Sequence, residues 1–493
     1  MKERLFFSRS FCVFEDASKD VDVCFYKGEK MIFRKLIGTK DFYKKVLYIT
    51  IPIILQNGIT NFVGLLDNIM VGQIGTDQMS GVAIVNQLLF VFNLSIFGGL
   101  SGAGIFTAQY FGKGSHEGVK HTFRFKIITS LLITLIGFSV LFFCKEPLIR
   151  MFLHDGSTTG NAEETLGYGI DYIMVMLIGL LPFAINSAYT STLRETGETV
   201  LPMKAGITAV IVNLCLNYIL IFGKLGAPAL GCVGAAIATV VSRFVECGIV
   251  VVWTHTHSKK NPFIVGAFKS LYIPLPLVKK ILIKGSPLMI NEFLWSTGMT
   301  LLTQNYSTRG LATVTALNIS NTINNVFNVI YIALGSTVAI IIGQLLGANK
   351  MEEAKREDTQ LIAFSVGSCF VVGAILILIA PLFPQLYNTT DEVKQLAKYL
   401  IYVVAIMMPI NAFLHATYFT LRSGGKTIIT FFFDSVFICC VSVPAAYILA
   451  HYTNLPIVLL FVLVQSLDLI KCVVGFILVK KGVWLHNMVS GQE

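Results

Sequence analysis

Residues 86–112, NQLLFVFNLSIFGGLSGAGIFTAQYFG, return later in the chain as residues 321–347, NTINNVFNVIYIALGSTVAIIIGQLLG. The same gapless alignment extends over residues 44–120 and 279–355. It pairs Pro52 with Pro287, Gly75 with Gly310, Asn86 with Asn321, Phe92 and Asn93 with Phe327 and Asn328, Gln109 with Gln344, Gly112 with Gly347, and Glu117 with Glu352. Apolar residues match by composition alone, but matched Pro, Gly, Asn and Gln residues indicate an internal repeat.

The composition indicates a membrane protein. Hydrophobic residues make up 54% of the 493 residues and charged residues 13%, whereas a soluble domain has roughly 25% charged residues. The formal net charge of +10 does not indicate nucleic-acid binding, because Lys and Arg lie in short connectors instead of one stripe. The ten cysteines are scattered through apolar segments, so we expect neither a disulfide framework nor a metal site, and no cofactor.

Runs of about 20 apolar residues, the length that crosses the hydrocarbon core, recur along the chain. They predict helices at 46–72, 80–108, 127–147, 169–191, 200–222, 231–254, 281–305, 314–345, 360–382, 395–421, 427–450 and 456–479. Each half of the repeat therefore holds six spans. Because six is even, both halves enter the membrane in the same sense and are related by a pseudo-two-fold axis along the membrane normal.

The predicted fold is thus an all-α integral membrane protein with twelve transmembrane helices in two six-helix lobes. The predicted parts are an N-terminal segment 1–40, an N-lobe 41–254 (helices 1–6), a connector 255–280, a C-lobe 281–482 (helices 7–12) and a tail 483–493. Acidic residues interrupt the segment 1–30, so it is not a signal peptide, and we expect an over-long start or a disordered tail.

Basic residues predict the orientation. Lys and Arg cluster before the first predicted helix, after the second and eighth, in the connector 255–280 and at the C-terminus, whereas Asp155, Glu163, Glu164, Asp391 and Glu392 lie in alternate connectors. This asymmetry places both termini in the cytoplasm. We expect a multi-pass protein of the inner (plasma) membrane that contacts lipids and acts as a monomer.

Three separated motifs resemble the MATE (multidrug and toxic compound extrusion) family. They are LLDNIMVGQIGTDQMSGVAI at 65–84, VNLCLNYILIFGKLGAPALGCVGAAIAT at 212–239, and the paired loops LRETGET at 193–199 and LRSGGKT at 421–427. The resemblance covers the chain from Met31 onward. It implies two lobes arranged in a V and the antiport of organic, often cationic, compounds against Na⁺ or H⁺.

Acidic residues inside a span are costly and mark functional candidates. Asp67 lies about 32 Å along its helix, and Asn213 and Asn217, spaced i, i+4, lie on one helical face about 20 and 26 Å along theirs. These oxygen-bearing side chains share the outer half of the first lobe and predict a cation or proton site. The resemblance carries that site onto Asp67, Asn213 and Asn217, and also onto Tyr172 and Thr239. The alternative is that Asp67 caps a helix end and the Asn side chains bridge helices.

The second lobe offers Glu292, about 16 Å into its helix and so near the midplane. It aligns with Asn57 of the first lobe. The MATE resemblance implies an acidic partner on the tenth helix, where this chain has Asn411 instead. His415, one turn later on the same face, is a titratable replacement, although an ordinary hydrogen-bonded interhelical His is the alternative.

Other chemistry is disfavoured. GGKT at 424–427 lacks the first Gly of a phosphate loop, and HEGVKH at 116–121 has the wrong spacing for HExxH, so we expect no enzyme. Arg243 with Glu246, and Asp468 with Lys471, are spaced i, i+3 and predict internal ion pairs. The alternative to an exporter is a lipid-linked saccharide flippase of the same broader superfamily, which would need several Arg or Lys to hold pyrophosphate.

Overall fold

The computed structural model describes residues 36–153 and 161–490, and every regular element in them is helical. Within these residues, ten segments are long and apolar enough to cross a membrane. The remaining long helices, α2 (Lys40–Gly72) and α10 (Leu275–Ser307), have 33 residues each and carry more polar side chains. They are the first helices of the two repeats, and they complete two sets of six.

The first set comprises α2, α3 (Thr76–Lys113), α4 (His116–Phe143), α6 (Ala162–Met176) continuing through η1 (Leu177–Gly179) into α7 (Leu180–Glu195), α8 (Val200–Phe222) and α9 (Gly231–Thr256). The second set begins with α10, α11 (Leu311–Gly347), α12 (Met351–Ile379) and α13 (Asp391–Ser423). Its fifth helix is continuous through α14 (Thr427–Phe431), the π-helical turns η4 (Phe432–Val436) and η5 (Ile438–Ser442), and α15 (Val443–Tyr452). Its sixth helix consists of α16 (Ile457–Ser466) continuing into α17 (Asp468–Lys480). Short helices α5 (Lys145–Arg150), η2 (Pro262–Ile264) and η3 (Phe383–Leu386) lie in connectors.

Local signals explain where several helices begin. The side chains of Thr39, Ser115 and Thr390 each accept a hydrogen bond from a backbone N–H in the first turn of α2, α4 and α13. Such N-caps satisfy backbone donors that a helix start leaves free. The helices therefore extend past the apolar runs, and α2 begins at Lys40 where the run of apolar residues predicts 46.

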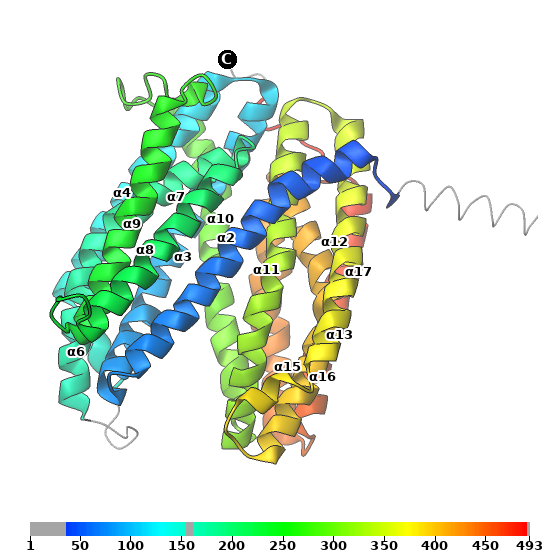
Figure 1. Cartoon of the computed structure of the whole chain (residues 1–493). Helices are drawn as coiled ribbons and strands as arrows, with labels where there is room; N and C mark the ends of the chain where they lie inside the picture. The colour runs from blue at the N-terminus through cyan, green and yellow to red at the C-terminus, as the bar shows by residue number, and fades with distance from the viewer. Residues whose placement is uncertain (1–35, 154–160, 491–493) are drawn as a thin grey trace, which may run out of the picture.

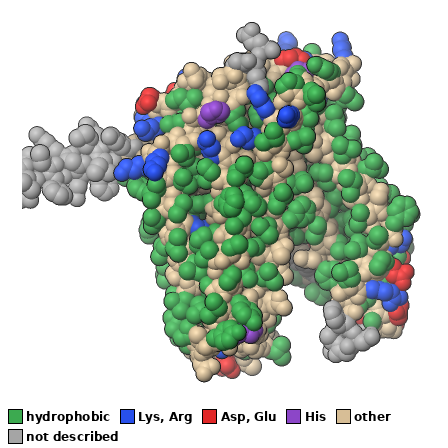
Figure 2. Space-filling model, turned by 180° about the vertical axis from the view of Figure 1, so that it is seen from behind, with side chains coloured by type: hydrophobic (Ala, Val, Ile, Leu, Met, Phe, Trp, Pro, Cys, Tyr) green, Lys and Arg blue, Asp and Glu red, His purple; other side chains and the backbone are tan. Residues whose placement is uncertain are grey.

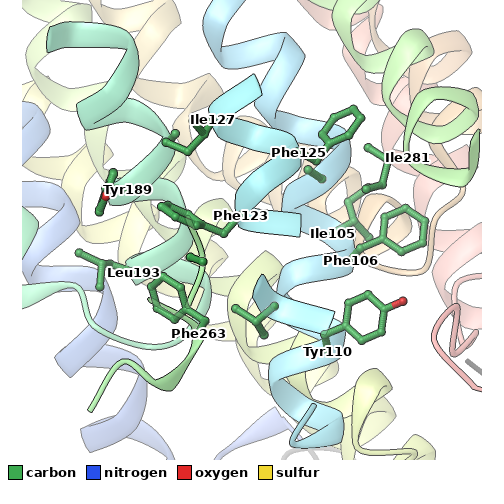
Figure 3. Close-up of a cluster of buried hydrophobic side chains, with 14 of the residues drawn as sticks. Ile105, Phe106, Tyr110, Phe123, Phe125, Ile127, Tyr189, Leu193, Phe263 and Ile281 are labelled. Atoms are coloured by element: carbon green, nitrogen blue, oxygen red, sulfur yellow. The ribbon is translucent and has the colours of Figure 1, made fainter. Parts of the chain in front are cut away.

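The two lobes share their cores at one end of the molecule, which we call the tail end because the C-terminal segment lies there (Figure 1). One core cluster joins α3, α4 and α7 of the first lobe to Ile281 and Leu288 of α10 (Figure 3). The repeat-related cluster joins α11, α12 and α13 to Val46 and Ile53 of α2. Each lobe thus receives the first helix of the other at the tail end.

At the opposite end, the far end, each lobe has a core of its own. The buried residues of one cluster all lie between Val71 and Val240, and those of the other between Leu302 and Val464. The molecule is visibly hollowed between the lobes towards the far end (Figure 2). The two-lobe, all-helical membrane fold expected from the repeat is confirmed, and this structure is open at its far end.

Helices α3 and α11 cross at the tail end with no room for side chains at two repeat-related glycines. A Cβ added at Gly112 would lie 1.9 Å from the carbonyl oxygen of Gln344, and one added at Gly347 would lie 1.9 Å from that of Gln109. Close backbone approach of this kind requires glycine. The pseudo-symmetry therefore holds at the level of single contacts.

The connector between the lobes packs on the first lobe. It runs from the end of α9 at Thr256 to the start of α10 at Leu275. The buried guanidinium of Arg124 on α4 donates to the carbonyls of Ala267, Gly266 and Tyr272 at 2.7, 3.0 and 3.0 Å. The proposed segment 1–30 lies outside the described residues, and the division of the chain into parts stays a prediction.

Candidate functional site

Four of the predicted first-lobe residues form one hydrogen-bonded chain near the far end. The amide nitrogen of Asn217 donates to Asp67 Oδ1 at 2.6 Å and to Asn213 Oδ1 at 3.1 Å. Asn213 in turn donates to Thr239 Oγ1 at 3.3 Å. Helices α2, α8 and α9 are thereby joined through polar side chains inside an apolar lobe.

Burial changes along this chain of residues. Asp67 is partly exposed, whereas Asn213 and Asn217 are buried, with 4% and 0% of their surface accessible. Asn217 Oδ1 is buried and has no hydrogen-bond partner among the described side chains. A buried amide oxygen without a partner is unfavourable, and together with the carboxylate of Asp67 it offers the type of oxygen ligand that hard cations prefer.

Tyr172 and Arg243 lie beside this chain of hydrogen bonds. Tyr172, on α6, is buried and lies within electrostatic range of both Asp67 and Arg243. The Arg243 guanidinium stacks over the ring of Phe183 at 5.1 Å and donates to the carbonyl of Gly179 at 3.4 Å. No direct salt bridge joins Arg243 to Glu246 among the described residues, although the two charges lie within electrostatic range of each other and Glu246 is hydrogen-bonded to Asn186. The direct ion pair predicted from their spacing is therefore not formed.

The second lobe places an acid near Glu292 that sequence reasoning did not assign to it. Asp434, on the π-helical turn η4, accepts from Asn291 Nδ2 at 3.0 Å, and Ser435 donates to Asn291 Oδ1 at 2.7 Å. Glu292, the next residue on α10, is within electrostatic range of Asp434 and Arg422. Such π-helical turns often occur at functional sites. The signal available in the sequence was Asp434 itself, an acid within a predicted span.

Neither His415 nor Asn411 is hydrogen-bonded to Glu292 or Asp434 among the described residues, although His415 and Asp434 both lie within electrostatic range of Lys471. The His415 ring packs on Tyr331 of α11, with ring centroids 4.7 Å apart. Asn411 is partly exposed, and within the described part of the chain it makes no recorded side-chain hydrogen bond. Lys471 and Asp468 form the predicted ion pair at 3.0 Å. A coupling role for Asn411 and His415 stays a prediction.

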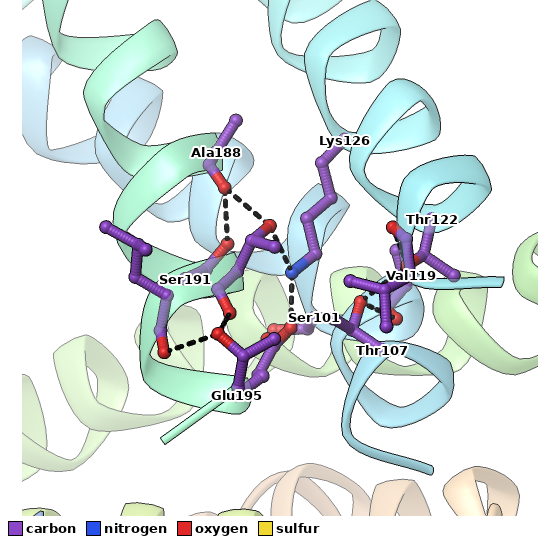
Figure 4. Close-up of polar contacts among 12 residues, drawn as sticks. Ser101, Thr107, Val119, Thr122, Lys126, Ala188, Ser191 and Glu195 are labelled. Carbon is purple, nitrogen blue, oxygen red and sulfur yellow. Dashed lines mark hydrogen bonds and ion pairs between the residues drawn. The ribbon is translucent and has the colours of Figure 1, made fainter. Parts of the chain in front are cut away.

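A buried ion pair in the first lobe was missed by the sequence reasoning. Lys126 on α4 is fully buried, and its ammonium pairs with Glu195 and donates to Thr192 Oγ1 at 3.2 Å (Figure 4). Glu195 lies in the LRETGET motif, which is evident in the sequence. Its pairing with Lys126 could not be predicted, because Lys126 is far away in sequence and resembles the surrounding connector lysines.

A cavity of about 300 Å³ lies between the lobes, lined by α3, α4 and α10. Apart from Ser95, its lining side chains are apolar or glycine, and they include Phe92, Met289 and Phe293. Met289 and Phe293 flank Glu292 in sequence. The cavity therefore joins an apolar surface to the helix that carries the second-lobe acid.

Comparison with known proteins agrees with this architecture. The MatE family model matches the chain twice, over residues 52–219 and 287–448, and the two matches begin at the repeat-related Pro52 and Pro287. The chain belongs to the MatE family. It is accordingly a membrane transporter and not an enzyme.

Relatives and solved structures extend the match over most of the chain. It is 24% identical over 414 residues to the probable multidrug resistance protein NorM of Thermotoga maritima, covering 84% of this chain and 86% of the relative. It is 26% identical over 429 residues to that of Halalkalibacterium halodurans, covering 84% and 88%. An outward-facing multidrug resistance MATE family transporter of the MOP superfamily has a TM-score of 0.79 at 20% identity, covering 91% of this chain and 97% of that one. A MOP superfamily transporter from Pyrococcus furiosus has a TM-score of 0.75 at 20% identity, with the same coverage. This MatE protein therefore shares its fold with both structures.

Proposed function

We propose that this MatE protein is a secondary antiporter that exports organic, often cationic, compounds or drugs in exchange for H⁺ or Na⁺. The two lobes would rock about their shared cores at the tail end, so that a central space opens alternately to each side. The names of the relatives, probable multidrug resistance proteins, support the drug-export part. The coupling ion is the substrate that drives the cycle, and no cofactor is required.

The single observation that carries the coupling proposal is the chain of hydrogen bonds that begins at Asp67. A carboxylate, a partnerless buried amide oxygen and a tyrosine converge in one lobe. A proton bound there would neutralise the carboxylate of Asp67, and a bound cation would compensate its negative charge. Because Asp67 and Asn217 belong to different helices, this change favours one packing of α2 against α8 over another.

The apolar cavity supports an organic cargo. Its aromatic and methionine side chains, Phe92, Phe293 and Met289, offer hydrophobic contact without a fixed pattern of hydrogen bonds. Pockets of this composition accept varied apolar compounds. Charge for a cationic cargo is available from Glu292, which lies on α10 between the lining residues Met289 and Phe293.

We further propose that the tail end faces the cytoplasm. Most Lys and Arg side chains visible on one face of the molecule gather towards the tail end, and apolar side chains cover the middle (Figure 2). The positive-inside rule then places both termini in the cytoplasm of a plasma-membrane protein. On this assignment the structure is outward-open, and the partners are small molecules and membrane lipids, with the protein acting as a monomer without nucleic acid.

The alternative is a flippase for a lipid-linked saccharide. Its pyrophosphate would require free cationic side chains in the central space. Among the described residues, several cations inside the helical lobes are engaged by neighbouring side chains: Lys126 pairs with Glu195, Lys471 with Asp468, and Arg243 stacks on Phe183. This arrangement favours the antiporter.

Dye efflux from proteoliposomes tests the proposal. Protein reconstituted with a fluorescent organic cation is given a pH gradient, a Na⁺ gradient or no gradient. We expect efflux to accelerate with one of the two gradients, and that gradient identifies the coupling ion. Gradient-independent movement of a labelled lipid-linked saccharide, with no dye efflux, would support the flippase and end the antiporter proposal.

A further inference from the structure

The C-terminal segment 484–490 joins the cores of the two lobes. Trp484, with 1% of its surface accessible, belongs to the second-lobe cluster at the tail end. Met488 and Val489, with 8% and 0% accessible, belong to the first-lobe cluster. Within the six residues from Trp484 to Val489, the chain is therefore buried in one lobe at its start and in the other at its end.

Gln109 of α3 holds the backbone of this segment with both ends of its amide. Its nitrogen donates to the carbonyl of His486 at 3.3 Å, and its oxygen accepts from the N–H of Met488 at 2.8 Å. Asn487 donates across to the carbonyl of Gly347 on α11 at 3.3 Å. These contacts hold the segment largely through its main chain, while turns within the segment shape it.

The same glutamine also bridges the lobes directly. Gln109 donates to the carbonyl of Ser423 at 2.9 Å, and its repeat partner Gln344 donates to the carbonyl of Glu195 at 2.9 Å. Each glutamine thus reaches the LRxxGxT loop of the opposite lobe. These two hydrogen bonds lie where the lobes must separate for the tail end to open.

The two loops differ where the segment lies. Gly424 in the second-lobe loop occupies the position of Thr196 in the first. A Cβ added at Gly424 would lie 1.9 Å from the carbonyl oxygen of Trp484. The backbone φ of Gly424 is −84°, which any residue adopts, so the space taken by the segment, and not the backbone conformation, excludes a side chain there.

We propose that the seam between the lobes at the tail end is a peptide-binding site, that its occupant is the chain's own segment 484–490, and that the docked segment holds the tail end closed. Opening of this end separates Trp484 from Met488 and Val489, so the segment must leave one lobe first. The inference rests on the alternating-access mechanism proposed above, since only that mechanism requires the tail end to open.

Hydrogen–deuterium exchange of the full-length protein in lipid vesicles tests this inference without measuring transport. Gly424→Thr gives the second-lobe loop the residue of the first and displaces the segment. We expect amides at the tail-end halves of α3 and α11 to exchange about tenfold faster than in the parent, because these amides are protected while the lobes are closed. Gly367→Thr is the matched control, because a Cβ at Gly367 meets nothing within 4 Å.

A second variant and a peptide keep the test decisive. A protein that ends at Val483 should show the same faster exchange, and a synthetic peptide of sequence VWLHNMVS, residues 483–490, should restore the protection. Unchanged exchange in Gly424→Thr and in the truncated protein would overturn the inference. Because exchange is read without a gradient or cargo, failure of dye efflux with altered exchange would reject only the antiporter proposal.

Discussion

At the scale of single residues, the buried pair of Lys126 and Glu195 links packing within a lobe to contact between lobes. Lys126 has no accessible surface, and an unpaired charge in such a place is strongly unfavourable. Its carboxylate partner belongs to Glu195, whose backbone carbonyl accepts the cross-lobe hydrogen bond from Gln344 at 2.9 Å. The ion pair therefore fixes the loop that meets the other lobe.

Removing one member of this pair should destabilise the protein more than removing both. Lys126→Met leaves Glu195 without its cation, and Glu195→Gln leaves a buried ammonium, so each should cost about 3–5 kcal/mol of folding stability. The double variant buries no net charge and should lie closer to the parent. Unfolding in detergent, followed by tryptophan fluorescence against denaturant, measures all four proteins. A double variant with the summed loss of both singles would contradict the pairing.

The sequence could predict contacts within one helix better than contacts between helices. The spacing of Asn213 and Asn217 placed them on one face, and they are hydrogen-bonded at 3.1 Å. The proximity of Asp434 to Glu292 depends on how α10 packs against η4, and no periodicity encodes it. Arg243 and Glu246 had helical spacing as well, but they make no direct salt bridge: Arg243 stacks on Phe183 and Glu246 bonds to Asn186.

At the scale of elements, the crossing of α3 and α11 controls how closely the lobes approach. Gly112 and Gly347 lie where each helix meets the other's backbone at the tail end. Their repeat relation was visible in the sequence, but their mutual contact was not, because a repeat specifies equivalent positions and leaves open which ones touch.

Gly347→Ala should force the two helices apart. The added methyl group would overlap the carbonyl of Gln109, and overpacking of this kind costs about 1–3 kcal/mol. We expect lower thermal stability in detergent together with faster amide exchange at the tail end. Gly367→Ala on α12, with open space around the new methyl group, serves as the control and should unfold like the parent. Equal thermal stability of both variants would show that α3 and α11 can move apart at their crossing without loss of folding stability.

The docking of the C-terminal segment 484–490 between the lobes should weaken as pH falls. Burial, and then the nearby ammonium groups of Lys426 and Lys284, lower the pKa of His486 below its usual range. A lowered pKa means that the docked segment favours neutral imidazole, so the contribution of His486 to docking is fully present above the free pKa of about 6.5 and declines progressively below it. The protection of the Met488 amide, which is bonded to Gln109, should decrease below about pH 6.5 in the parent once exchange is corrected for its intrinsic pH dependence. His486→Gln should remove this dependence, and its persistence in the variant would assign it to another group.

Secondary structure and topology were the most predictable features of the chain. Apolar runs and the repeat predicted two sets of six helices, and the structure has them in that order. The short helix α5, the break at η1 and the π-helical turns were not predictable from hydropathy, because they depend on local hydrogen bonds and neighbours. The role of segment 484–490 also required the structure, since its few apolar residues give no periodic signal.

At the scale of the whole molecule, a nearly symmetric frame carries asymmetric chemistry. In the repeat alignment Asp67 is equivalent to Leu302, and Glu292 is equivalent to Asn57. The backbone contacts at the seam are duplicated, as Gln109 and Gln344 illustrate, whereas the acids are not. In the proposed mechanism, the shared cores at the tail end would act as the hinge between lobes with separate cores at the far end, and the unduplicated acids would make the lobes respond differently to a bound ion.

This asymmetry leads to a prediction about which lobe couples transport to the ion gradient. Asp67→Asn keeps the size of the side chain and much of its hydrogen bonding to Asn217, but removes the negative charge. A structural helix cap would tolerate this change, whereas an ion site would not. We expect normal expression, retained binding of the organic cargo, and loss of gradient-driven efflux. Asp171→Asn, the same change at an exposed first-lobe position, should transport like the parent. If Asp67→Asn also transports like the parent while Glu292→Gln is inactive, coupling belongs to the second lobe, where Asp434 and Arg422 lie within electrostatic range of Glu292.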